Sequence, residues 1–192
     1  MSRVAERSSL TADEYLAWER EQAGKHEFFH GEVFAMAGGT PRHNALGVSI
    51  GAELRAVLRS RGCSVLSSDQ RLAFPPHERY VYPDVTVICG PPVFQPGTDD
   101  VITNPTILVE VLSASTEEYD RGLKWIGYQR IASLTDYLLV AQAEARIEHY
   151  RRNSDGSWTY RTAGPGEHVV LTGGSELVID AIYAGMFDLP GE

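Results

Sequence analysis

The amino-acid sequence predicts a mixed α/β fold built as one domain. The chain has 192 residues, of which 43% are hydrophobic and 22% charged, and this composition suits one full-sized core. Capping patterns and helical spacing mark helices, while short runs of β-branched residues between them mark strands. No internal repeat, low-complexity block or long linker divides the chain. We therefore expect a single domain over residues 1–192.

A helix and a tight hairpin are predicted for the start of the chain. Residues 11–14, Thr-Ala-Asp-Glu, form a capping-box pattern, and the apolar side chains after it predict a helix that ends near Gly24. Residues 27–29, Glu-Phe-Phe, and residues 33–36, Val-Phe-Ala-Met, supply aromatic and branched strand residues and flank the turn-like segment 30–32. They predict two antiparallel strands.

A long amphipathic helix and four strands are predicted next. Thr40 and Pro41 suit the N-cap and first turn of a helix, which Gly62 ends. Its apolar residues recur at helical spacing: Leu46, Ile50, Leu54, Val57 and Leu58. The strand candidates are residues 63–68, 70–74, 82–89 and 106–112. The last two are almost continuously apolar, which indicates interior strands, and a loop rich in proline and glycine joins them.

A third helix is predicted after the last of these strands. Residues 115–118, Ser-Thr-Glu-Glu, form a second capping-box pattern, which predicts a helix through about Ile131. Tyr119, Leu123 and Ile126 are expected to form its buried side.

The remainder of the chain predicts an antiparallel C-terminal extension. Residues 136–141 suit one more strand of the sheet. Residues 145–151 and 158–162 then alternate in the manner of strands around the turn sequence at 153–156.

Hydropathy and cysteine content argue against several classes of protein. The first ten residues lack the apolar stretch of a signal peptide, and no run approaches the roughly 18 apolar residues of a membrane span. We therefore expect a soluble, cytoplasmic protein without a membrane partner. Cys63 and Cys89 each lie inside an apolar run, so we expect buried free thiols, not a disulfide framework or a zinc site.

The distribution of charge bears on nucleic-acid partners. The formal net charge of −9 argues against a protein that binds nucleic acid by bulk electrostatics. Only the segment between Arg42 and Arg79 carries more basic than acidic side chains. His43 stands in the first turn of the predicted long helix, where it is a candidate for contact with a phosphate, although a solvated helix end explains it as well.

Two carboxylates stand in segments that otherwise look buried. Asp84 follows Pro83 at the start of an apolar run, and Glu110 lies inside another. A lone buried carboxylate costs several kcal/mol unless it is paired, protonated or bound to a metal. On neighbouring strands the two could share Mg²⁺, which suits phosphodiester hydrolysis. The alternative is that Asp84 caps a turn and Glu110 meets an arginine inside the fold.

A polar face of the third predicted helix complements these carboxylates. Asp120, Lys124 and Tyr128 are spaced at i, i+4 and i+8 and so share one face, which we expect beside the buried one. A lysine there would stabilise charge that builds up on a phosphate or hold an attacking water. The alternative is an ordinary surface pair between Asp120 and Lys124.

Several ordered blocks carry a family resemblance. They are Pro83-Asp84, Glu110 within Val109-Glu110-Val111-Leu112-Ser113, Ser115-Thr116, Tyr119-Asp120-Arg121-Gly122 and Lys124. From about Leu10 to Phe187, the chain resembles the Uma-type restriction endonuclease family within the PD-(D/E)XK nuclease superfamily. The resemblance implies a restriction-endonuclease-like central mixed sheet flanked by helices.

The resemblance also implies a metal-dependent endonuclease that hydrolyses DNA phosphodiester bonds. Asp84 and Glu110 would hold Mg²⁺ or Mn²⁺, with Glu27 as a third carboxylate. Leu112 departs from the superfamily pattern, because the lysine of the E-x-K element is expected there. Lys124 is the natural substitute from the following helix, and His43, Asp120 and Tyr128 are the candidates for substrate contact.

Two alternatives accompany this interpretation, together with one expectation about assembly. A nuclease-like fold without catalysis would serve as a nucleic-acid-binding or assembly module, for which the missing E-x-K lysine and the net charge argue. Residues 47–51 match the G-x-S-x-G pattern of serine hydrolases, but Ser49 lies within a continuous helical pattern and not in a strand-to-helix turn. By analogy with nucleases that cut both strands, exposed strand edges in the tail would support a homodimer.

Overall fold

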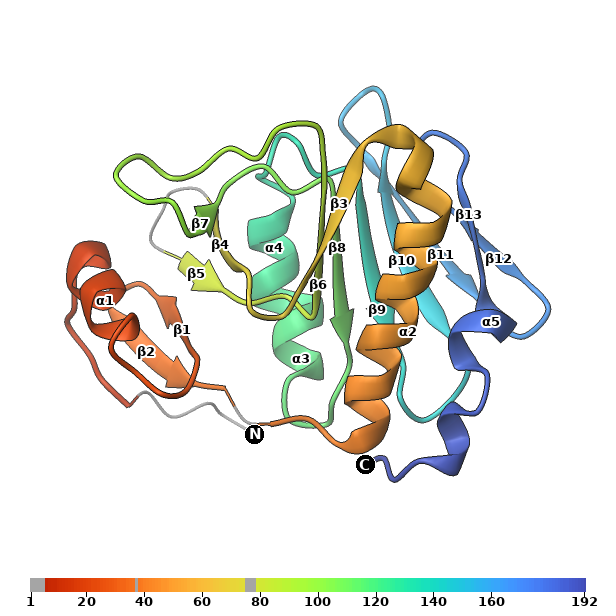
Figure 1. Cartoon of the computed structure of the whole chain (residues 1–192), viewed down its shortest axis with the longest axis horizontal. Helices are drawn as coiled ribbons and strands as arrows, with labels where there is room; N and C mark the ends of the chain where they lie inside the picture. The colour runs from red at the N-terminus through yellow and green to blue at the C-terminus, as the bar shows by residue number, and fades with distance from the viewer. Residues whose placement is uncertain (1–5, 37, 75–78) are drawn as a thin grey trace.

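Three β-sheets and the helices around them make up the computed structural model, which describes residues 6–36, 38–74 and 79–192 (Figure 1). The fold is mixed α/β, as predicted. The first five residues belong to the segment in which we expect no signal peptide, and they lie outside the described range. Among the described residues, no helix combines the length and apolar content that crossing a membrane requires.

The central sheet has six strands in the order β11-β10-β9-β8-β6-β3. Their bounds are β3 (Cys63–Ser67), β6 (Val85–Cys89), β8 (Ile107–Val111), β9 (Asp136–Val140), β10 (Ile147–Arg152) and β11 (Trp158–Ala163). β8 and β9 pair in parallel, whereas the other neighbours are antiparallel, so the sheet is mixed. All six strands were predicted, and β6 and β8 are interior strands as expected.

A second sheet and a separate hairpin complete the strands. The second sheet has the order β2-β1-β5-β4-β7. Its strands are β1 (His26–Phe29), β2 (Glu32–Ala35), β4 (Arg71–Phe74), β5 (Arg79–Val81) and β7 (Val101–Ile102), and the hairpin pairs β12 (His168–Val170) with β13 (Glu176–Val178). β5, β7, β12 and β13 were not predicted, because two or three residues are too few to show strand alternation.

The first two helices begin where their capping residues predict. In α1 (Ala12–Glu19), Thr11 and Glu14 form the reciprocal hydrogen bonds of a capping box. In α2 (Pro41–Leu58), the Thr40 hydroxyl accepts a hydrogen bond from the His43 amide. A 3₁₀ turn, η1 (Arg59–Arg61), follows, and Gly62 ends it in the left-handed conformation, at φ 66°. Two short C-terminal elements, α5 (Ile179–Tyr183) and η3 (Met186–Asp188), were not predicted.

The third helical segment differs from the prediction in its start, shape and buried side. It consists of α3 (Glu117–Tyr119), a π-helical turn η2 (Asp120–Lys124) and α4 (Trp125–Tyr128). The predicted capping box is absent, since the Thr116 side chain makes no capping hydrogen bond. Leu123 and Ile126 are 47% and 49% exposed, so their prediction as buried residues was wrong. The buried residues of the segment are instead Asp120, Lys124, Gly127 and Tyr128.

Two apolar cores cover the two faces of the central sheet. Val109 and Val111 of β8 face α2, whose buried residues Leu46 and Ile50 belong to the same core. Leu108 belongs to the core on the opposite face, together with Tyr128 and Leu112. Since side chains alternate along a strand, Glu110 projects to the face that α4 covers. Figure 1 shows α2 and the α3–α4 segment beside the central strands.

The two cysteines form a disulfide bond, so the prediction of free thiols was wrong. Cys63 and Cys89 lie directly opposite each other in the antiparallel pairing of β3 with β6. Each cysteine does lie in an apolar strand, as the sequence indicates. Their approach depends on the pairing of two strands that lie apart in the sequence, and no local pattern reports that pairing.

Candidate active site

Asp84 directly precedes the first residue of β6 and lies next to β8. Val85 of β6 lies opposite Val109, so the residue before Val85 comes beside Glu110. Asp84 Oδ2 accepts a hydrogen bond of 2.7 Å from the Val111 amide. Asp84 Oδ1 lies 3.2 Å from Nε2 of His43, which projects from the first turn of α2. One carboxylate thus joins two strands and a helix.

Glu110 lies at the centre of a buried ionic cluster. Its Oε1 is 3.0 Å from Lys124 Nζ and accepts a hydrogen bond of 2.8 Å from the Tyr128 hydroxyl. Lys124 Nζ also lies 3.0 Å from Asp120 Oδ1 and 3.2 Å from Glu27 Oε1. The cluster therefore gathers residues from β1, β8, the π-helical turn and α4 around one ammonium group.

The π-helical turn places the lysine. Asp120 and Lys124 are its first and last residues, and both side chains face Glu110's side of the sheet instead of solvent. The Tyr137 hydroxyl of β9 donates a hydrogen bond of 3.1 Å to the Asp120 carbonyl and so anchors the backbone of the turn. Single π-helical turns inside α-helices are frequent at functional sites.

Burial and mutual repulsion set the charges of this cluster. Burial raises the pKa of Glu110 well above its usual value, and Asp120, Asp84 and Glu27 add to the rise against the opposing effect of Lys124. Burial lowers the pKa of Lys124, but Asp120 and Glu110 outweigh it and raise that pKa well above normal. Lys124 is therefore charged at neutral pH, and the carboxylates around it outnumber it.

His43 extends the polar site toward the surface. Its side chain is 17% exposed and that of Asp84 is 19% exposed, whereas Glu110 is only 4% exposed. Burial lowers the pKa of His43, but the hydrogen bond and charge of Asp84 raise it above its usual value on balance. His43 Nδ1 is buried without a hydrogen-bond partner among the described residues.

The resemblance implies a divalent metal, for which the site offers carboxylate ligands. Within residues 6–36, 38–74 and 79–192, no three His, Cys, Asp or Glu side chains converge as a complete metal site. Mg²⁺ needs only one or two carboxylates, because water and substrate phosphates complete its shell. The hydrogen bonds of Glu110 to described residues both use Oε1 and leave Oε2 for a further ligand. Asp84 and Glu110 fit Mg²⁺, whereas Glu27 is engaged with Lys124.

A groove between α2 and β3 leads to Asp84. His43, Gly47, Gly51 and Arg55 recur every four residues along one face of α2 and line it, with Asp84 at the His43 end. At 1.5 Å per residue, Arg55 lies roughly 18 Å from His43 along the helix. The groove wall is open at Gly47, where a Cβ atom would meet no atom within 4 Å.

The structure places the sequence-predicted site residues in two groups. Those in mutual contact or in one network are Asp84 with His43, and Glu110 with Lys124, Tyr128, Asp120 and Glu27. Leu112 is a buried apolar residue, 6% exposed, and Lys124 occupies the polar surroundings of Glu110. Ser49 lies inside α2, and its hydroxyl donates to the Ile182 carbonyl, which excludes a nucleophile elbow.

Gln142 is a nearby polar residue that the sequence did not single out. Its side chain is 6% exposed, and Nε2 donates a hydrogen bond of 2.6 Å to the Leu112 carbonyl. Its Oε1 accepts a hydrogen bond of 2.9 Å from the Thr40 hydroxyl at the N-cap of α2. Gln142 thus links the start of α2 to the end of β8. The signal in the sequence was a polar residue directly after the apolar run 137–141.

Two proteins of Synechocystis sp. are similar to the chain over most of its length. The chain is 36% identical over 178 residues to "Uncharacterized protein slr1290" of Synechocystis sp., covering 92% of this chain and 93% of that protein. It is 37% identical over 155 residues to "Uncharacterized protein sll1609" of the same organism, covering 81% and 88% of the two chains.

A solved structure and a family model match almost the whole chain. A crystal structure described as "a putative nuclease belonging to DUF820" from Anabaena variabilis superposes with a TM-score of 0.74. It covers 92% of this chain and 99% of that chain at 16% identity, so it shows a shared fold. Residues 12–180 match the model of a family described as "Putative restriction endonuclease". The chain therefore belongs to this family, Uma2.

Proposed function

We propose that the protein is a metal-dependent endonuclease that hydrolyses phosphodiester bonds in DNA. The observation that carries the proposal is the buried contact between Lys124 and Glu110, at 3.0 Å, with Asp84 beside the same strand. Two carboxylates and a lysine are the groups that a PD-(D/E)XK site requires. Here the lysine comes from the helical segment and not from the position of Leu112.

Each polar side chain has a role in this proposal. Asp84 and Glu110 would hold Mg²⁺ or Mn²⁺, which when bound stabilises negative charge on the phosphate and activates water. Lys124 orients Glu110 and supplies positive charge to the phosphate. Tyr128 and Asp120 fix Glu110 and Lys124, and the Tyr128 hydroxyl donates directly to the Glu110 carboxylate.

The groove beside α2 is the proposed path of the DNA strand. It ends at Asp84 and His43, the more accessible members of the site, and carries Arg55 on its wall. A phosphate near Asp84 would meet His43, whose pKa Asp84 raises, and a phosphate further along would meet Arg55. The family description and the nuclease-like neighbour support DNA as the substrate class.

The test is nicking of supercoiled plasmid and of single-stranded DNA in Mg²⁺ or Mn²⁺. We expect Asp84→Asn and Lys124→Met each to lower the cleavage rate about 10²-fold or more, as for other losses of charge stabilisation. Asp99→Asn makes the same chemical change as Asp84→Asn at an exposed loop position and should cleave normally. Thermal melting of each variant separates loss of catalysis from loss of folding.

The competing function is a nuclease-like binding module without catalysis. Equal nicking by wild type and Asp84→Asn would exclude the nuclease proposal, because the activity would then be a contaminant. DNA binding without cleavage by the wild type in either metal would favour the binding module. Loss of cleavage in Asp84→Asn but not in Lys124→Met would overturn only the role of the lysine.

A further inference from the structure

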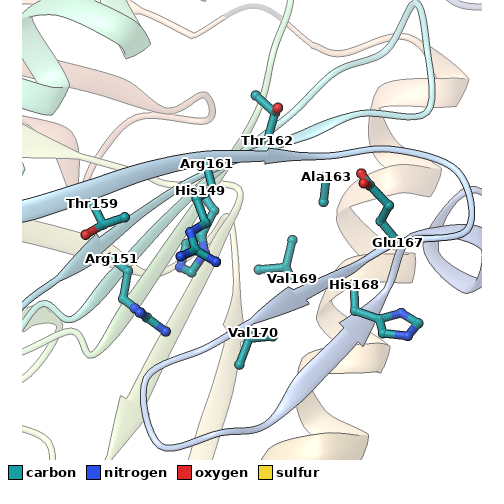
Figure 2. A pocket seen from close by; sticks show the side chains of 10 residues that line it. All are labelled: His149, Arg151, Thr159, Arg161, Thr162, Ala163, Glu167, His168, Val169 and Val170. Atoms are coloured by element: carbon teal, nitrogen blue, oxygen red, sulfur yellow. The ribbon is translucent and has the colours of Figure 1, made fainter.

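A second polar pocket lies between the β10–β11 strands and the β12–β13 hairpin (Figure 2). The pocket is separated from the candidate active site both along the strands and across the sheet. Asp136, which supports the pocket, pairs with Ile107 at the start of β8, while Glu110 pairs with Leu139 three positions on. At about 3.3 Å per residue, this separates the two sites by roughly 10 Å along the strands.

The two sites also face opposite sides of the sheet. His149 lies opposite Leu138, which belongs to the core on the α2 side. Glu110 lies opposite Leu139, which belongs to the core on the α4 side. Because neighbouring residues of paired strands project to the same face, the pocket and the carboxylate cluster are separated by the sheet itself.

Four polar side chains form a block on the pocket's sheet face. His149 and Arg151 alternate along β10, and Arg161 and Thr159 lie directly opposite them on β11. Figure 2 shows these side chains on one side of the sheet, with Val169 of the hairpin facing them. The pocket thus has a polar, mostly basic floor and an apolar wall.

A buried carboxylate orients the histidine. His149 and Asp136 have side chains that are 6% and 1% exposed, and His149 Nε2 lies 2.8 Å from Asp136 Oδ1. Asp136 is fixed in turn by hydrogen bonds from the Thr135 hydroxyl and the Thr172 amide. This contact orients the His149 ring, which lines the pocket.

The two arginines of the pocket have no anionic partner in the described part of the chain. The Asp136 carboxylate pairs with His149, and the Glu167 carboxylate at the rim accepts a hydrogen bond of 2.7 Å from the Gly164 amide. Guanidinium groups bind phosphate through paired hydrogen bonds, which makes Arg151 and Arg161 suited to a tetrahedral oxyanion.

We propose that this pocket binds a phosphate group, which Arg151 and Arg161 hold beside the ring of His149. The phosphate is carried either by the end of a nucleic-acid strand or by a small free phosphate compound. Binding there needs neither Mg²⁺ nor cleavage, so this proposal can be tested independently of the nuclease function.

The experiment is calorimetric titration of the purified protein with inorganic phosphate in buffer containing EDTA. We expect saturable binding that the double variant Arg151→Gln/Arg161→Gln weakens about tenfold or more, as for loss of hydrogen bonds to a charged group. The matched control is Arg130→Gln, an exposed arginine at the end of α4, on the side of the sheet that faces away from the pocket. A shift of the His149 imidazole NMR signals on titration should accompany binding in the wild type.

Two oligonucleotides distinguish the source of the phosphate. If a 5′-phosphorylated oligonucleotide binds more tightly than the same strand without its 5′ phosphate, and only with both arginines present, the ligand is a strand terminus. If both oligonucleotides bind alike while inorganic phosphate still depends on the arginines, the ligand is a free phosphate compound. Absence of saturable phosphate binding, or equal weakening by Arg130→Gln, would overturn the proposal.

Discussion

Single buried charges in this protein are held by more than one partner. Glu148 illustrates the rule outside the candidate active site, since its side chain is 4% exposed and lies between two arginines. Arg146 Nη1 is 2.7 Å from its Oε1, and Arg121 of the π-helical turn bonds its Oε2. Burial raises the pKa of Glu148, but the two arginines outweigh this effect, and on balance the pKa lies below its usual value.

This lowered pKa predicts a pH-dependent contribution to stability. A carboxylate with a folded-state pKa below the unfolded value stabilises the fold above about pH 4.3, and loses that effect as the pH falls through the folded-state pKa. We expect Glu148→Gln to lower the free energy of unfolding at pH 7 by about 2 kcal/mol. The difference in this free energy between variant and wild type should shrink below about pH 4. Urea unfolding across pH 3 to 7 measures the difference.

Glu144→Gln is the control, because Glu144 pairs with the same Arg146 but is 62% exposed. An exposed pair contributes roughly 0–1 kcal/mol, so this variant should differ little from wild type at any pH. A Glu148→Gln deficit that stays constant from pH 7 to pH 3 would contradict the electrostatic explanation.

At this scale the sequence predicted the carboxylates of the candidate site but not the Asp136–His149 pair beside the second pocket. Asp84 and Glu110 stand out as charges inside apolar runs. Asp136 lies at a strand boundary, and His149 lies in a strand of alternating polarity. Polar residues are common at both kinds of position, so neither residue stood out. Only strand pairing brings His149 beside Asp136.

The third helical segment shows why one element was predicted with the wrong buried side. Helical periodicity favours burial of the apolar residues, but Lys124 is drawn inward by Glu27 of β1, by Glu110 of β8 and by Asp120 of its own turn. A π-helical turn also holds an extra residue, which shifts the helical phase of all that follows by about 100°. A regular 3.6-residue pattern therefore cannot place Leu123 and Ile126 correctly.

The observed orientation predicts an unusual pattern of mutational effects. Leu123→Gln and Ile126→Gln should each change the free energy of unfolding by less than about 0.5 kcal/mol, because their side chains are half exposed. Tyr128→Phe should cost about 1–2 kcal/mol, because it removes the hydrogen bond to the buried Glu110 carboxylate. Urea denaturation of the three variants gives the comparison. A large cost at Leu123 with none at Tyr128 would show that the segment is rotated.

At the level of the whole molecule, the central sheet was predicted strand by strand but its order was not. Each of its strands has five or six residues, long enough to show its apolar pattern, whereas β5, β7 and the β12–β13 hairpin are shorter. Strand order is set by packing between distant segments, which no local pattern encodes. The disulfide followed from that order and so was missed.

The disulfide predicts a stability that depends on redox conditions. Cys63 and Cys89 are 26 residues apart, and closing a loop of that length is worth about 3.5 kcal/mol in the chain-entropy description. We expect dithiothreitol to lower the free energy of unfolding of the wild type by about that amount. The Cys63→Ser/Cys89→Ser variant should match the reduced wild type and be insensitive to dithiothreitol. Equal stability of the oxidised and reduced wild type would contradict this prediction.

The same bond restricts how copies of the protein can associate. β3 is an edge strand of the central sheet, and edge strands are the elements most easily exchanged between copies in domain swapping. A covalent link to the interior strand β6 keeps β3 in its own sheet while the disulfide is intact. With the disulfide intact, strand exchange at this sheet would involve the opposite edge strand, β11. Reduction would also release β3 for exchange, and this would be a second way to form intertwined dimers.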